Sequence, residues 1–343
     1  MPASSFDTFF ACTIIVAAAL IGMAFLGSTM QTRISSTQDI NKDSYLKAIA
    51  DRIIMNPGSP SEWGSSSASP IDFGLASSLP HNAFELDVDK ICRLNNLNNY
   101  SLSYLDLSKA AKLNIALGIE VSQLLTIKII QSSNSTVGSD TSFTFQISAN
   151  IDSKPTSASL HCYFTANTYL TEVNASISDF GVGQVTVQIP TSETENALLI
   201  AFARASIDDR ITSYAIYNFA RSTQESIPSD TNLVLSPLDY MLNFNDTNLR
   251  VLNGYIFSYS YKQPLLSFES SQAAIPKLLD KSPLVLIVGM NGTDHIQEWT
   301  AYPQIPLKIG ANFEGSEQNI FSYIVTIKGV LYRLDLSLGD LPR

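Results

Sequence analysis

The longest uncharged stretch of the chain lies close to its N-terminus and constrains the fold more than any other feature. No residue between Asp7 and Arg33 is charged, and the segment from Phe9 to Gly27 is almost wholly apolar. A helix of this length spans roughly 30 Å, the thickness of the hydrocarbon core of a bilayer. The sequence therefore predicts a transmembrane helix, with the membrane as partner through residues 9–27.

The flanks of this segment bear on processing and orientation. Residues 1–8 contain no Lys or Arg, whereas a cleaved secretory signal has a basic start and a shorter apolar core, so the pattern favours an uncleaved, single-pass anchor. Arg33, Lys42, Lys47 and Arg52 follow the segment, and the positive-inside rule would keep them in the cytoplasm. The rest of the chain is poor in Lys and rich in Ser, Thr and Asn. This composition favours the opposite orientation, and we expect the bulk of the chain outside the cell.

Small side chains gather in the apolar segment, and such side chains allow helix backbones to approach each other closely. The candidate residues for helix packing are Phe9, Ala17, Ala18, Gly22, Ala24 and Gly27. Because Ala and Gly are also common in membrane helices generally, a monomeric anchor and an assembly of helices both stay open.

The helical pattern continues past the apolar segment. Apolar residues recur at helical spacing from Tyr45 to Ile54, and Pro57-Gly58 ends the helix, which predicts one long helix within residues 1–55. Residues 56–120 combine a loop rich in Ser, Pro and Gly with two short helical patterns, Asp87–Leu94 and Asp106–Leu117. Each pattern opens with an Asp that can cap the first amides, and we expect a helical collar here.

From residue 121 onward the apolar residues alternate with polar ones, which is typical of half-buried strands. About seven short strands between Leu125 and Phe219 predict an immunoglobulin-like β-sandwich over residues 121–222. The polar stretch Arg221–Asp230 marks a boundary, and further strands predict a second β-rich domain over residues 231–343. The predicted fold class is mainly β, with an N-terminal long transmembrane α-helix and a helical collar followed by two β-sandwich-like (Ig-like) domains.

The terminal stretch Ile324–Leu338 is strongly β-forming. At a sheet edge it would offer backbone groups to a neighbouring subunit. The alternative, which we favour, is a central strand pair of the second domain with its turn near Lys328-Gly329.

Composition narrows the classes of function. The chain of 343 residues has 31 Asp+Glu against 21 Lys+Arg and a net charge of −10, so no surface is suited to nucleic acid. With three His and three Cys, and without a hydrolase elbow, zinc-protease motif, P-loop or calcium loop, it has little equipment for catalysis or metal binding. We expect no enzymatic activity, cofactor or metal.

Two cysteines lie outside the apolar segment, Cys92 and Cys162. In an oxidising exterior they are a candidate disulfide, and two buried free thiols are the simpler account. Sequons for N-glycosylation occur at five positions, although the abundance of Asn, Ser and Thr makes several expected by chance. The sequons are Asn99, Asn134, Asn174, Asn245 and Asn291.

Few residues have the types that catalysis or metal binding requires. Asp294 adjoins His295, and His161 adjoins Cys162, but neighbours on a strand point to opposite faces, so the latter pair is no dyad. The acidic pairs Asp208-Asp209 and Glu314 with Glu317 can contact calcium only if the fold gathers them. Otherwise they are ordinary solvated carboxylates.

Five short motifs up to about residue 118 form a recognisable series: FDTFF before the apolar run, LKAIADRIIMNPGSPSEWG from Leu46, FGLA from Phe73, LDVDKICRL from Leu86 and LGI from Leu117. This series resembles the N-terminal region of archaeal type IV pilin-like surface proteins (class III signal/anchor). The resemblance implies a hydrophobic helix that stays in the membrane or packs into a filament core, with a β-rich head outside. Pilins carry a basic leader, whereas MPASS alone precedes Phe6, so cleavage and filament assembly stay open. Asp7 lies where pilins carry an acidic residue, or simply forms a polar flank.

The expected function is that of a cell-surface structural protein, a pilin-like subunit in a surface filament or in adhesion that associates with itself or with related subunits. The alternative is a membrane-tethered extracellular binding module for carbohydrate or a protein partner. An exposed cluster of Tyr255, Tyr259 and Tyr261 would favour that alternative. An enzyme ranks third and would need a cleft that joins His161 or His295 to carboxylates.

Overall fold

The structure is a computed structural model that forms two compact units, Met1–Asp51 and Arg52–Arg343. The described residues are 3–112, 115–166, 169–191, 197–219, 233–236, 238–244, 250–265, 272–276, 281–291, 295–311, 313 and 318–339. The predicted boundary Arg221–Asp230 lies outside them.

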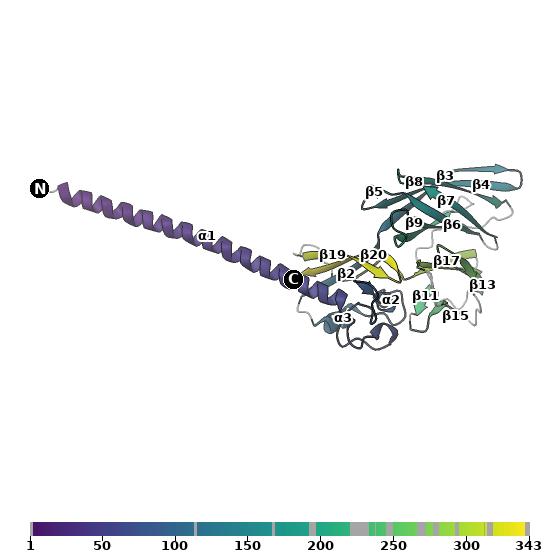
Figure 1. The fold of residues 1–343 in the computed structure, drawn as a ribbon, viewed down its shortest axis with the longest axis horizontal. Coiled ribbons are helices and arrows are strands. Elements are labelled where there is room, and N and C mark those ends of the chain that lie inside the picture. The colour runs from purple at the N-terminus through teal and green to yellow at the C-terminus, as the bar shows by residue number, and fades with distance from the viewer. Residues whose placement is uncertain are drawn as a thin grey trace. The chain divides into compact units, whose positions relative to one another are not determined.

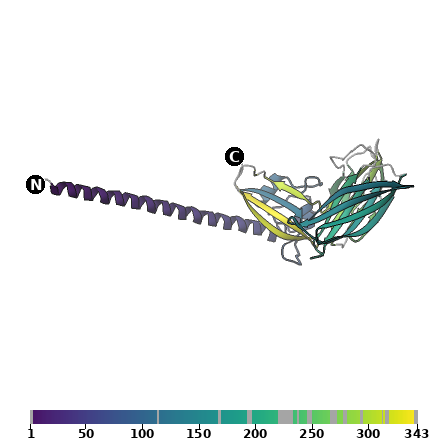
Figure 2. The same ribbon diagram turned by 90° about the horizontal axis from the view of Figure 1, so that it is seen from above.

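The helix α1 runs unbroken from Ala3 to Met55, which confirms the long N-terminal helix (Figures 1 and 2). It ends where expected, because Pro57 has no amide hydrogen to continue the ladder. Its last carbonyl groups find partners in the following loop: Leu75 N–H donates to Ile53 O at 2.8 Å, and Ala76 N–H donates to Asn56 O at 3.1 Å.

The prediction that this helix is transmembrane is wrong. Within the part of the chain that the structure describes, no helix is both long enough and apolar enough to cross a membrane. The predicted fold class is corrected accordingly, and its mainly β character is confirmed.

The collar contains the short helices η1 (Trp63–Ser65), α2 (Val88–Cys92) and α3 (Tyr104–Ala111), and side chains cap the N-termini of α2 and α3. Asp87 caps α2 as predicted, accepting hydrogen bonds from the amides of Asp89 and Lys90. In α3 the cap is Ser103, so this helix begins before the predicted Asp106. It ends at Ala111, since Lys112 has a left-handed φ of 54°.

Two buried cations hold the collar together. Lys90 Nζ donates to the carbonyl oxygens of Pro57 and Ala76 at 2.8 and 2.7 Å. Arg93, 2% exposed, donates to Tyr100 O, Trp63 O and Ala68 O. The cationic groups of Lys90 and Arg93 lie within 6 Å of the Trp63 ring centroid, in the range of cation–π contacts. These two side chains therefore link α2 to the backbone of the loops before and after it.

A five-stranded sheet lies beside the collar, in the order β1-β19-β20-β2-β18. Its strands are β1 (Glu85–Leu86), β19 (Gln318–Ile327), β20 (Val330–Gly339), β2 (Ala116–Gln123) and β18 (Leu307–Gly310). β20 pairs with both β19 and β2, so it lies in the middle of the sheet. It thereby joins two parts of the chain that are far apart in sequence. The alternation of Tyr332, Leu334, Leu336 and Leu338 buries one face of β20. β19 and β20 turn at Lys328-Gly329, as predicted.

The predicted β-sandwich is confirmed, and in Figure 1 its two sheets lie one over the other. One sheet contains β3 (Leu125–Val137), β4 (Asp140–Ile151), β5 (Lys154–Pro155) and β8 (Val182–Pro190). The other has the order β10-β9-β6-β7, with β10 (Thr212–Phe219), β9 (Ala197–Ala205), β6 (Ala158–Ala166) and β7 (Tyr169–Ile177). A core that includes Phe145, Phe164 and Leu199 fills the space between the sheets.

Two further sheets follow. One has the order β14-β13-β16-β17, with β14 (Lys262–Pro264), β13 (Arg250–Phe257), β16 (Leu284–Asn291) and β17 (His295–Tyr302). The other has the order β11-β12-β15, with β11 (Leu233–Ser236), β12 (Met241–Phe244) and β15 (Gln272–Ala274). Tyr163, Phe202 and Phe257 share a core between the second sandwich sheet and the β13–β16 sheet. Leu235, Leu242 and Leu286 share another.

The buried cations of the collar give the first testable prediction. Arg93→Met removes the donors for three carbonyl groups, and we expect a loss of about 2–4 kcal/mol in the free energy of unfolding because these acceptors stay buried. Urea unfolding followed by far-UV circular dichroism measures the loss. Arg210→Met, which removes only the exposed ion pair with Asp208, is the matched control and should cost less than about 1 kcal/mol. Equal stability of the two variants would contradict the role of Arg93.

Candidate functional site

The apolar segment of α1 is the most conspicuous candidate surface. Large apolar side chains point outward all around it, with exposed fractions of 67% at Phe10, 71% at Ile21 and 61% at Leu26. The hydroxyl groups within it are satisfied locally: Thr13 Oγ1 donates to Phe10 O and Ser28 Oγ to Phe25 O. Among the described side chains, this segment therefore presents a large exposed apolar surface.

The small residues of this segment offer a place for close helix approach. Ala17, Ala18, Gly22 and Ala24 are all exposed. Ala18 and Gly22 are four residues apart, so they share one face of the helix. A Cβ atom built on Gly22 meets nothing within 4 Å, so a larger side chain fits at this position without a clash inside the described part of the chain. The side chains of Phe9 and Gly27 lie outside the described residues.

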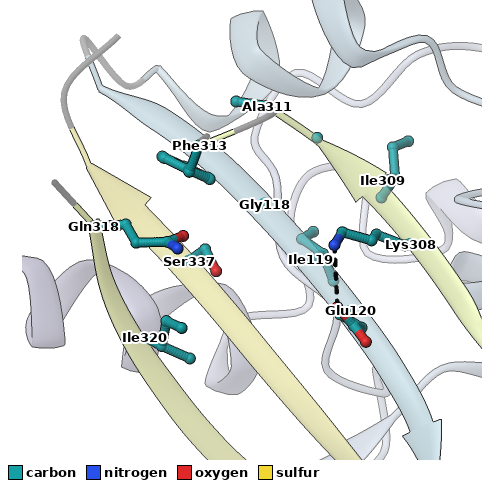
Figure 3. Close-up of a pocket in the computed structure, with 11 residues that line it drawn as sticks. Gly118, Ile119, Glu120, Lys308, Ile309, Ala311, Phe313, Gln318, Ile320 and Ser337 are labelled. Carbon is teal, nitrogen blue, oxygen red and sulfur yellow. Dashed lines mark ion pairs between the residues drawn. The ribbon is translucent and has the colours of Figure 1, made fainter. Parts of the chain in front are cut away.

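A pocket opens on the outer face of the five-stranded sheet (Figure 3). Its volume is about 660 Å³, and residues of β2, β18, β19 and β20 line it together with the segment after β18. Gly118 forms part of its floor, and the Phe313 ring lies over this glycine: a Cβ on Gly118 would be 3.2 Å from Phe313 Cε2. The missing side chain at Gly118 thus makes room for the Phe313 ring.

The remaining lining residues give the pocket mixed chemistry. Lys308 Nζ lies 3.6 Å from Glu120 Oε2, an ion pair at the rim that is largely exposed. Gln318 and Ser337 add an amide and a hydroxyl, and Ile320 adds an apolar side chain. An aromatic ring next to hydrogen-bonding groups suits a polar organic ligand better than an apolar one.

This pocket was missed by sequence reasoning. Gly118 falls within the LGI motif, but Phe313 and Gln318 lie about two hundred residues further along the chain. The register that places Gly118 opposite Ser337 is a tertiary contact. No local pattern carries this information.

The candidate disulfide is not formed. Cys92 and Cys162 are both free and buried, and they belong to different cores. Burial raises the pKa of the Cys162 thiol to about 12, and burial also raises the pKa of the Cys92 thiol. Both thiols are packing groups in this structure.

The described sequons lie at the surface. Asn99, Asn134 and Asn174 are exposed, so their amides are accessible to modification. Asn245 and the side chain of Asn291 lie outside the described residues. Glycosylation stays a prediction.

His161 lies where two sheets meet. Its Nδ1 is 2.9 Å from Tyr259 O, its ring stacks on Tyr163, and its Nε2 is 3.8 Å from Glu172 Oε2. Glu172 in turn pairs with Lys262 at 3.1 Å, and a hydrogen bond from Lys262 lowers the pKa of the carboxyl. These contacts join β6 and β7 to the segment around β14. His161 therefore has a structural role at this contact between sheets. The side chains of Asp294 and His295 lie outside the described residues.

The tyrosines that would mark a binding patch are largely packed. Tyr255 and Tyr259 contact the core around Phe257, and Tyr261 contacts the core around Leu286. Arg204 covers the ring of Tyr259 at 3.9 Å. No exposed aromatic cluster forms among these three residues.

The acidic pair Asp208-Asp209 has no calcium-binding arrangement in the structure. Asp208 is bound to Arg210 at 2.7 Å, and this hydrogen bond lowers the pKa of its carboxyl, while Glu314 and Glu317 lie outside the described residues. Within the described part of the chain, no group of three or more His, Cys, Asp or Glu is placed to hold a metal. The absence of an enzymatic activity stays a prediction.

The sequence matches no protein-family model and no curated protein. Among solved structures, the chain is similar to red sea bream transglutaminase, with 11% identity and a TM-score of 0.22, over 57% of this chain and 32% of that chain. It is also similar to HBP35 of Porphyromonas gingivalis, with 10% identity and a TM-score of 0.20, over 52% of this chain and 63% of that one. The chain covers less than two thirds of either protein, and similarity at this level assigns neither family nor function.

The buried thiols give a second prediction. Since the thiolate is the reactive form, iodoacetamide should leave Cys92 and Cys162 unmodified in the native protein and modify both after unfolding in denaturant. Peptide mapping by mass spectrometry measures each site. Rapid labelling of the native protein, or a peptide pair linked through these two cysteines, would contradict the structure.

Proposed function

We propose that this protein is a structural subunit of a cell-surface assembly, in which the N-terminal helices of several copies or of related subunits pack together and the β-rich unit faces outward. The observation behind the proposal is the exposure of the apolar segment of α1. Nine large apolar side chains between Phe10 and Leu26 are each more than half exposed. This surface requires a partner.

The energetics favour association. Full burial of a large apolar side chain is worth about 1.5–3 kcal/mol, and a soluble monomer rarely leaves a contiguous apolar patch this large uncovered. Copies of the same helix supply matching apolar surfaces, and the Ala18–Gly22 face allows their backbones to approach. A bundle of N-terminal helices is therefore the simplest arrangement that covers the segment.

Two further observations support an extracellular setting. The β-rich unit carries exposed sequons at Asn99, Asn134 and Asn174. The N-terminal motifs resemble those of pilin-like surface proteins, whose hydrophobic helices pack into filament cores. Under this proposal the head domains supply the outer surface of the filament, and adhesion is their role.

A second candidate function is binding of a saccharide in the Gly118 pocket. The observation that favours it is that Phe313, Glu120, Lys308 and Gln318 line the same pocket. Sugars use an aromatic platform and polar side chains of this kind. The packed tyrosines on β13 and after it contribute nothing to such a site.

The first proposal predicts that Gly22→Ile disrupts assembly. The added side chain keeps the segment apolar but prevents close helix approach, and we expect association weakened roughly tenfold or more. Sedimentation and electron microscopy of the full chain measure the change. Ile21→Leu, a neighbouring change that leaves the side-chain volume the same, is the control. A wild-type chain that sediments as a monomer, or a Gly22→Ile chain that assembles like the wild type, would refute the proposal.

The second candidate predicts that Gly118→Val abolishes saccharide binding, because the new side chain fills the floor of the pocket beside Phe313. A glycan array probed with the full-length wild type and the variant measures this, and circular dichroism checks the fold. Ser122→Val, on the same strand face outside the pocket, is the control. Binding that survives Gly118→Val would place any saccharide elsewhere.

A further inference from the structure

We infer that two copies of this chain pair edge to edge through β19, over residues Ile320–Ile324, in an antiparallel arrangement that joins two five-stranded sheets. This inference concerns only the unit Arg52–Arg343 and does not depend on association through α1. It adds a second, separate contact between copies.

The edge of β19 is covered only at one end. β1 pairs with β19 at two positions, Glu85 with Thr326 and Leu86 with Ile327. Thr326 N–H donates to Phe84 O at 3.0 Å, which shows that Thr326 directs its backbone groups to this edge. Since alternate residues of a strand direct these groups to the same side, Ile320, Ser322 and Ile324 do so as well. Among the described residues no strand pairs with β19 there.

This edge lacks the features that usually prevent pairing. Exposed edges are commonly protected by charged residues, by proline or by short length. The ten residues of β19, QNIFSYIVTI, contain no charge and no proline. The opposite edge of the same sheet is different: β18 has four residues, follows Pro306 and carries Lys308. Protection is therefore present on one side of the sheet and missing on the other.

The exposed residues of β19 match themselves under two-fold symmetry. Ile320 is 58% exposed and Ile324 is 49% exposed on the outer face, with Ser322 exposed between them. An antiparallel pair centred on Ser322 places Ile320 of each copy opposite Ile324 of the other. Each cross-strand pair then covers apolar surface. Because the strand is uncharged, no like charges meet.

A second copy is therefore the occupant that the sequence of this edge specifies. A two-fold contact uses the same patch on both subunits and needs that patch to be self-complementary. The order Ile, Ser, Ile along the outer face meets this condition. A strand from a different protein would need no such symmetry.

The test is disulfide cross-linking of the full chain. A Cys12→Ser background removes the cysteine of the apolar segment, so that cross-links there do not interfere. At the two-fold axis the Cα atoms of Ser322 are about 5.5 Å apart, within range of a disulfide. Ser322→Cys treated with diamide should therefore give a covalent dimer. Ser337→Cys lies on the same sheet face, but two strands separate it from its counterpart in the other copy, and it should give roughly tenfold less dimer. The double variant Ile320→Lys, Ile324→Lys should abolish the Ser322→Cys dimer, because lysines then face each other.

Combining these variants with Gly22→Ile separates this contact from the helix contact. A Ser322→Cys dimer that persists in the Gly22→Ile chain supports pairing at the edge, whatever becomes of the helix assembly. Equal cross-linking at positions 322 and 337, no dimer at 322, or cross-linking only to a different protein would overturn the inference. Circular dichroism of the double-lysine variant confirms that its fold is intact.

Discussion

The sheet β10-β9-β6-β7 is covered on both faces, and the arrangement of the β-rich unit depends on this coverage. Alternate residues of β9 point to opposite sides: Leu199 joins the core of the sandwich, while Ile200 and Phe202 join the core shared with β13 and β16. A shared sheet must satisfy two partners at once, so its residues have little freedom to change. The five-stranded sheet is tied to the same structure by the hydrogen bonds Tyr214 Oη to Ile305 O and Ser213 Oγ to Gln123 Oε1.

Local sequence predicts elements of this protein well where the apolar pattern is unambiguous. β6 and β9 lie within the predicted series of short strands, and each is a run of largely apolar residues. β2 was read partly as the end of a helix, since Leu117 continues the spacing of the preceding apolar residues. The strand assignment depends on pairing with β20, more than two hundred residues away. The Gly118 pocket is built on that same pairing, so no local sequence pattern could predict it.

The N-terminal helix shows the opposite limit. Its extent from Ala3 to Met55 followed from periodicity and from Pro57, but periodicity and hydropathy do not specify the surroundings of an apolar helix. Phe10 and Ile21 contribute the same hydropathy whatever packs against them, so their identity does not say what their surroundings are. What differs is the tolerance for bulk at Gly22, since packed helices require close approach at particular positions and lipid does not. The surroundings of the helix therefore depend on steric fit at particular positions, which the amino-acid composition does not describe.

The central position of β20 has a consequence for the order in which the protein is made. The sandwich strands β3–β10 lie within one stretch of chain and can pair while synthesis continues, since domains generally fold as they emerge. β2 emerges before them but finds β20 only after the ribosome has passed Gly339. Until that moment the collar beside β2 lacks its sheet, whereas the apolar helix has long been exposed. A chain interrupted before β20 is made therefore has a folded β-sandwich next to a collar and a strand β2 that lack their sheet partners. Quality-control proteases can recognise such a partly folded state.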